Sequence, residues 1–151
     1  MMLKCFYVLI LFFFINLDQS QVGSTPISES INISGFLKIL NGNQMPSLNI
    51  IKQRNENVSG QKIIAVKGRV KANPRESSVP YDSLSSIAIE AYTNKKGLFD
   101  FHLKSGVYTF FIVKDNKAYL NSFDGNGYFK ATTIDLYTDK LEIVDDSKLI
   151  Y

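Results

Sequence analysis

Short runs of alternating apolar and polar residues make up most of the chain after its first 20 positions. Within residues 61–71, Ile64, Val66 and Val70 alternate with Lys67 and Arg69, which is the period of a strand with one buried face. Similar composition, rich in Val, Ile, Thr and aromatic residues, predicts further strands at 33–40, 86–92, 98–103, 107–114, 117–123, 128–134 and 140–144. No helix is expected after residue 20.

Turn signals separate these runs. In residues 93–97, a polar run ends in Gly97, which predicts a tight hairpin because glycine adopts positive φ without strain. Further turns are predicted at Ser105 and Gly106, at Asp115 and Asn116, and at 124–127, and a long connection at 72–84. Seven or eight short strands with close-set turns predict an all-β fold, an antiparallel β-sandwich of immunoglobulin-like type.

The first 20 residues have the three parts of a secretory signal peptide. Lys4 supplies a positive charge, residues 5–17 are apolar except for Asn16, and residues 18–20 are polar. The apolar run is shorter than the roughly 20 residues that a membrane-spanning helix needs. We therefore predict a signal-peptide helix at 1–20, a flexible lead-in at 21–32 and one domain at 33–151, secreted or located in the periplasm or at the cell surface, with no permanent membrane span.

Cysteine content and charge exclude several classes of function. Cys5 is the only cysteine and lies in the leader, so the exported chain would have no disulfide and no thiol chemistry. The net charge of +3 comes from interspersed Lys, Arg, Asp and Glu. Nucleic-acid binders instead concentrate Lys and Arg in a stripe or patch, so we expect no nucleic-acid partner.

Residues 93–113 carry a recognisable pattern: a threonine, a polar turn ending in glycine, an aromatic strand, and then Gly106, Val107 and Tyr108. This stretch resembles the core of carboxypeptidase regulatory-like domains. Residues 42–46 and 123–127 resemble an exported group of such proteins from Bacteroidetes. The resemblance covers about residues 33–134 and implies a transthyretin-like sandwich of seven strands. It implies an accessory role beside a peptidase at most, and no peptidase chemistry.

The sequence offers no set of catalytic residues. His102 is the only histidine and alternates with Phe101 and Leu103, so its side chain should point away from theirs. The usual zinc ligand sets are excluded because there is no second histidine and no cysteine outside the leader. The nucleophile-elbow pattern GxSxG does not occur either. We therefore predict a protein that is not an enzyme and requires no cofactor.

Calcium is the one metal that the sequence leaves open. Asp124 and Asn126, on a tight loop with two glycines, offer carboxylate and amide oxygens, and Asp135 or Asp139 could add ligands. A plain glycine turn is the alternative interpretation of this loop. Four tyrosines could form an aromatic platform for carbohydrate or peptide, although strand aromatics more often pack against neighbours: Tyr81, Tyr92, Tyr119 and Tyr128.

These observations favour an exported, non-enzymatic module for protein interaction or structural support in the cell envelope, with an unknown protein or glycan as partner. An exposed sheet edge could capture an extended strand of that partner. The first alternative is a calcium- or carbohydrate-binding domain that uses the loop at 124–127. The second is an accessory domain associated with a peptidase.

Overall fold

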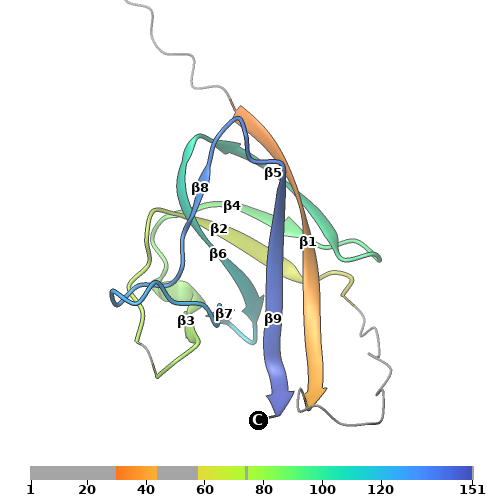
Figure 1. Ribbon diagram of the computed structural model, residues 1–151, viewed down its shortest axis with the longest axis vertical. Helices are drawn as coiled ribbons and strands as arrows, with labels where there is room; N and C mark the ends of the chain where they lie inside the picture. Colours follow the sequence, from red (N-terminus) through yellow and green to blue (C-terminus); the bar gives the residue numbers. More distant parts are fainter. Residues whose placement is uncertain (1–29, 44–57, 74, 151) are drawn as a thin grey trace, which may run out of the picture.

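The computed structural model describes residues 30–43, 58–73 and 75–150, and within them the protein is all-β (Figure 1). The described residues form nine strands in two sheets, with one short 3-10 turn at Tyr81–Ser83. They contain no helix that is long and apolar enough to cross a membrane. The predicted signal peptide at 1–20 lies outside the described residues, and β1 begins at Ser30, before the predicted start of the domain at Ile33.

The two sheets differ in size. The three-stranded sheet has the order β5-β1-β9, and the six-stranded sheet has the order β3-β7-β6-β2-β4, with β8 paired to β6 beside this path. The strands are β1 (Ser30–Asn43), β2 (Lys62–Lys67), β3 (Ser78–Pro80), β4 (Ile87–Tyr92), β5 (Leu98–Lys104), β6 (Gly106–Lys114), β7 (Lys117–Tyr119), β8 (Thr132–Ile134) and β9 (Lys140–Ile150). In Figure 1, β1 and β9 run side by side across the sheet that contains β2, β4 and β6.

The main core lies between the two sheets. One hydrophobic cluster contains residues of β1, β5 and β9 from the smaller sheet together with residues of β2, β6 and β8 from the larger one. Alternation explains this arrangement, because every second residue of a strand points to the same face. In β5, Phe99, Phe101 and Leu103 are buried whereas His102 is exposed, so the predicted orientation of His102 is confirmed.

The larger sheet has a second core on its other face. Ile64, Phe111 and Phe129 are completely buried there, in a cluster completed by Val66, Ala72 and Ala118. The rings of Phe111 and Phe129 meet edge to face with centroids 5.1 Å apart. Both faces of β2 and β6 are therefore buried, which explains why β2 has four consecutive buried residues instead of strict alternation.

The turn at 93–97 does not form the predicted hairpin. Gly97 has the expected positive φ of 77°, but β4 belongs to the six-stranded sheet and β5 to the three-stranded one. The turn thus carries the chain from one sheet to the other, and so does the reversal before Gly106 between β5 and β6. Phe101 and Phe110 consequently meet across the core, with ring centroids 5.7 Å apart.

The predicted antiparallel pairing is also incomplete. β1 and β9 are parallel, and their register shifts so that Asp146 and Ser147 of β9 lie opposite the single residue Leu40 of β1. The other strand pairs are antiparallel. A parallel pair joins distant parts of the chain, so no local turn signal announces it. By contrast, the predicted turn at Asp115 and Asn116 is confirmed, since both have positive φ and connect β6 to β7.

Candidate binding groove beside β9

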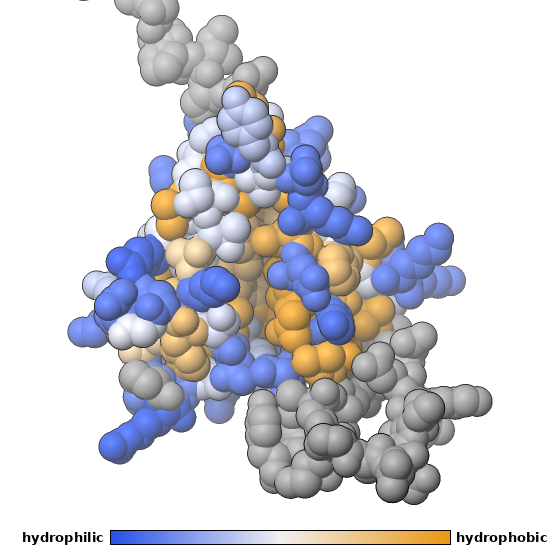
Figure 2. All heavy atoms as spheres, in the orientation of Figure 1, coloured by the Kyte–Doolittle hydropathy of each residue, from blue (hydrophilic) through white to orange (hydrophobic). Residues whose placement is uncertain are grey.

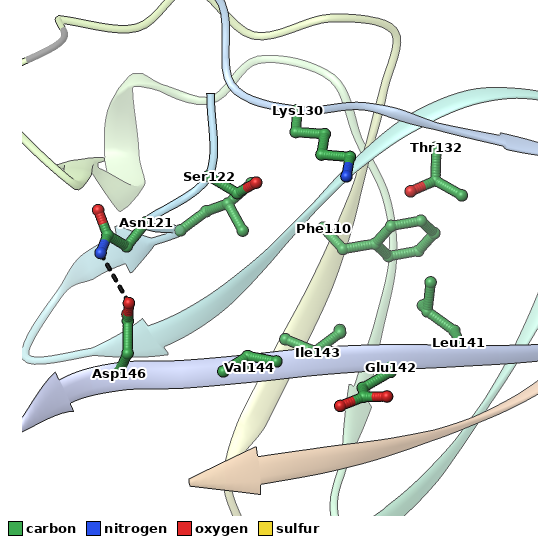
Figure 3. Close-up of a pocket in the computed structure, with 11 residues that line it drawn as sticks. Phe110, Asn121, Ser122, Lys130, Thr132, Leu141, Glu142, Ile143, Val144 and Asp146 are labelled. Carbon is green, nitrogen blue, oxygen red and sulfur yellow. Dashed lines mark hydrogen bonds between the residues drawn. The ribbon is translucent and has the colours of Figure 1, made fainter. Parts of the chain in front are cut away.

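A groove with a volume of about 380 Å³ runs along β9. It lies between β9 of the smaller sheet and the segment 120–132, which connects β7 to β8 (Figure 3). Figure 2 views the face of the molecule that carries β1 and β9, where apolar residues gather beside a hollow. The groove is concave and lined by both apolar and polar side chains, so it is the candidate binding site.

One wall of the groove is the edge of β9 itself. Four consecutive residues, Leu141 to Val144, line it, followed by Asp146. Successive side chains of a strand point to opposite faces, so consecutive lining residues mean that the backbone edge borders the groove. Among the described residues β9 pairs only with β1. Its other edge therefore presents backbone N–H and C=O groups that no described strand uses.

The floor of the groove is apolar and the opposite wall is polar. Phe110 of β6 faces Leu141 and Ile143 of β9, and all three belong to the main core. The wall across from β9 consists of Leu120, Asn121, Ser122, Lys130 and Thr132. An apolar floor with a few polar groups at the rim is typical of sites that bind a ligand in one orientation.

A pair of hydrogen bonds at Asp146 closes one end of the groove. Oδ1 of Asp146 accepts a hydrogen bond of 2.6 Å from the hydroxyl of Tyr119, and Oδ2 accepts one of 2.7 Å from Nδ2 of Asn121 (Figure 3). We call these three residues the clasp. The clasp ties β9 to Tyr119 at the end of β7 and to Asn121 two residues later, and therefore joins the two sheets at this point.

The neighbouring Asp145 is buried, with an exposed fraction of 1%. Its carboxylate accepts hydrogen bonds from the Lys114 amine and from the Ser147 hydroxyl, the latter at 2.7 Å. Burial favours the neutral acid and raises the pKa of Asp145, but the hydrogen bonds from Lys114 and Ser147 outweigh it, so the pKa lies below its usual value. The side chains of the adjacent residues Asp145 and Asp146 both reach the larger sheet. They can do so because the bulge in β9 interrupts the alternation of side chains between the two faces of the strand.

Lys130 is the cation of the groove. Figure 3 shows its amine directed toward the space above Phe110. Within the described part of the chain the only ion pairs are Lys62 with Glu90, Arg69 with Asp124 and Lys114 with Asp145, so Lys130 has no carboxylate partner there. A lysine that borders an apolar floor without an anionic partner is a feature that a ligand could use.

Asp124 and Asn126, the predicted calcium ligands, lie on an ordered turn. Oδ1 of Asp124 accepts backbone hydrogen bonds from Asn126 at 2.8 Å and from Tyr128 at 3.2 Å. Its Oδ2 pairs with Arg69, whose guanidinium lies 4.4 Å from the centre of the Tyr128 ring. A cation at this carboxylate would have to replace the Arg69 contact.

Asp135 caps a different turn, where Oδ1 accepts hydrogen bonds of 3.0 Å from the Tyr137 backbone and from the Thr138 hydroxyl. The described residues contain no cluster of three His, Cys, Asp or Glu that could hold a metal ion.

The four tyrosines that the sequence suggested as an aromatic platform contact three different cations. Lys62 lies over the rings of Tyr81 and Tyr92, at 5.1 Å and 5.8 Å, and its amine pairs with Glu90 at 3.0 Å. Hydrogen bonds from Tyr81 and Lys62 lower the pKa of Glu90. The remaining two belong elsewhere, because Tyr128 contacts Arg69 and Tyr119 forms part of the clasp with Lys114 above its ring.

The groove was not identified from the sequence. Its floor residues look like ordinary core positions, and Lys130 looks like a lysine on a loop. Asp145 and Asp146 form an acidic pair near the end of the chain, which usually indicates a solvated surface. The sequence contains one indication of the groove. After Val144, Asp145 and Asp146 interrupt the alternation of apolar and polar residues.

The sequence was compared with known proteins. It matches no family model, and no curated protein matches it significantly.

Proposed function

We propose that the chain is an exported, non-enzymatic binding module that holds an extended segment of a partner protein along the free edge of β9. The observation that carries this proposal is the lining of the groove by consecutive residues of one strand edge, from Leu141 to Val144. An added strand would satisfy the backbone groups of that edge, and its alternate side chains would enter the groove above Phe110.

The fold supports this function through rigidity. β9 is held on one side by its long pairing with β1 and at its bulge by the clasp and the Lys114–Asp145 pair. A strand edge that is fixed before binding loses little conformational entropy when a partner pairs with it. We propose further that the two sheets form a transthyretin-like β-sandwich of the carboxypeptidase regulatory-like type, exported through the signal peptide at 1–20 to the periplasm or the cell surface.

The experiment selects a phage library of random heptapeptides on the chain from residue 21 onward. Selection is repeated on the variant Ser122→Trp, in which an indole fills the groove. The matched control is Ser85→Trp, which puts the same side chain at an exposed position outside the groove. We expect peptides that bind the wild type and Ser85→Trp and lose affinity for Ser122→Trp.

Hydrogen–deuterium exchange locates the bound peptide. Backbone amides of residues 141–146 should exchange more slowly when a selected peptide is present, because the new strand uses their hydrogen-bonding groups. Peptides that protect another surface, or that bind Ser122→Trp as well as the wild type, would contradict the proposal.

Calcium or carbohydrate binding at residues 124–127 has less support. Both carboxylate oxygens of Asp124 already accept contacts within the fold, from Arg69 and from two backbone amides. An accessory role beside a peptidase is compatible with the proposed binding module, because the partner could itself be a peptidase.

A further inference from the structure

The lining of the groove contains one cation, Lys130, and two carboxylates, Glu142 and Asp146. Asp146 accepts two hydrogen bonds in the clasp, and Asp145 is paired with Lys114 beneath β9. Glu142 lines the groove from β9, but its carboxylate points away from Lys130 in Figure 3. The Lys130 amine is therefore the one cation that points into the groove, and none of the ion pairs among the described residues includes it.

The surroundings of Lys130 strengthen its interaction with an anion. Phe110 lies below it and Leu141 and Ile143 lie across from it, so a bound peptide would exclude water from this side of the amine. Removal of water lowers the local dielectric and strengthens a charge-assisted hydrogen bond. The amine would remain unneutralised if the bound segment were purely apolar.

We propose, on the basis of the function proposed above, that the partner segment carries a carboxylate that pairs with Lys130. In an extended strand, side chains two positions apart share a face. The acidic residue should therefore stand two positions from an apolar residue that covers Phe110. The ligand is an extended acidic peptide with the pattern apolar, any residue, acidic, or the same pattern in the reverse order.

The experiment compares peptides selected on the wild type with peptides selected on Lys130→Glu. The control is Lys95→Glu, which makes the same change of net charge at an exposed lysine outside the groove. Wild type and Lys95→Glu should enrich Asp or Glu two positions from an apolar residue. Lys130→Glu should enrich Lys or Arg at that position, because the charge of the side chain at position 130 is reversed.

Synthetic peptides then measure the effect. The best acidic peptide should bind Lys130→Gln about 2- to 5-fold more weakly than the wild type, as expected for the loss of one exposed ion pair. Changing the peptide's acidic residue to its amide should weaken wild-type binding by a similar factor and leave the binding to Lys130→Gln unchanged. Versions with a free and an amidated C-terminus show whether the carboxylate belongs to a side chain or to the chain end.

The outcomes separate the two proposals. If groove-dependent peptides show no acidic preference, and Lys130→Gln binds them as well as the wild type does, the acidic pairing is wrong and strand addition stands. If no peptide depends on the groove, as judged by Ser122→Trp, strand addition is wrong and the acidic pairing falls with it.

Discussion

The hydroxyl of Tyr119 donates a hydrogen bond of 2.6 Å to Oδ1 of Asp146. It joins the end of β7 in one sheet to the bulge of β9 in the other. Tyr119→Phe removes the hydroxyl and keeps the ring beneath Lys114. We expect the free energy of unfolding to fall by about 1 kcal/mol, measured by urea denaturation, as for a typical intramolecular hydrogen bond.

The clasp also fixes the end of the groove. Amides near Ser147 should exchange faster in Tyr119→Phe than in the wild type, because β9 has lost one of its links to the other sheet. Tyr137→Phe is the control, since Tyr137 is almost fully exposed. Equal stability of Tyr119→Phe and the wild type would show that Asn121 alone holds Asp146.

The Lys114–Asp145 pair predicts a dependence of stability on pH. The pKa of Asp145 is lower in the folded protein than in the unfolded chain, so its contribution to stability is complete above the unfolded pKa of about 3.9. The contribution is lost as the pH falls through the lower folded pKa. The wild type should therefore lose more stability than Asp145→Asn when the pH falls from about 5 to about 2. Thermal unfolding of both proteins over this pH range measures the difference.

Lys114→Met should destabilise the protein more than Asp145→Asn does at neutral pH. The first change leaves a buried carboxylate without its cation, whereas the second removes the charge. We expect a loss of about 2–4 kcal/mol for Lys114→Met, reduced from the fully buried case because the lysine side chain is 27% exposed. Lys117→Met, at an exposed lysine, is the control. A smaller loss for Lys114→Met than for Asp145→Asn would contradict this account.

Gly35 is required by the ring of Phe99. A Cβ on Gly35 would lie 2.3 Å from Cζ of Phe99 and 3.0 Å from the carbonyl oxygen of Leu141. Gly35→Ala should therefore cost about 1–3 kcal/mol in unfolding free energy. The double variant Gly35→Ala with Phe99→Leu should cost less than the sum of the two single changes, because the shorter side chain leaves room for the methyl group. Asn32→Ala, on the exposed face of the same strand, is the control.

Calcium should not stabilise the protein at the loop of Asp124. The carboxylate holds Arg69 and two backbone amides, so Asp124→Ala should lower the free energy of unfolding by about 1 kcal/mol in the absence of calcium. Thermal unfolding with millimolar calcium chloride and with a chelator should give the same midpoint. A higher midpoint with calcium that disappears in Asp124→Ala would favour the calcium-binding alternative.

The sequence by itself determined the all-β class, most of the strand positions and the inward face of β5, because these depend on local alternation and turn residues. Asp115 and Asn116 show this well, since a two-residue polar turn requires positive φ and forms a hairpin wherever the flanking strands pair.

Only the tertiary structure decided which strands are neighbours. Gly97 permits a turn whether the next strand pairs with β4 or crosses to the other sheet, so the crossing follows from the burial of Phe99 and Phe101 against β6. The parallel pairing of β1 with β9 joins residues about 100 positions apart in the sequence. The groove, the burial of Asp145 and the position of Lys130 all depend on that pairing, and therefore no local pattern could reveal them.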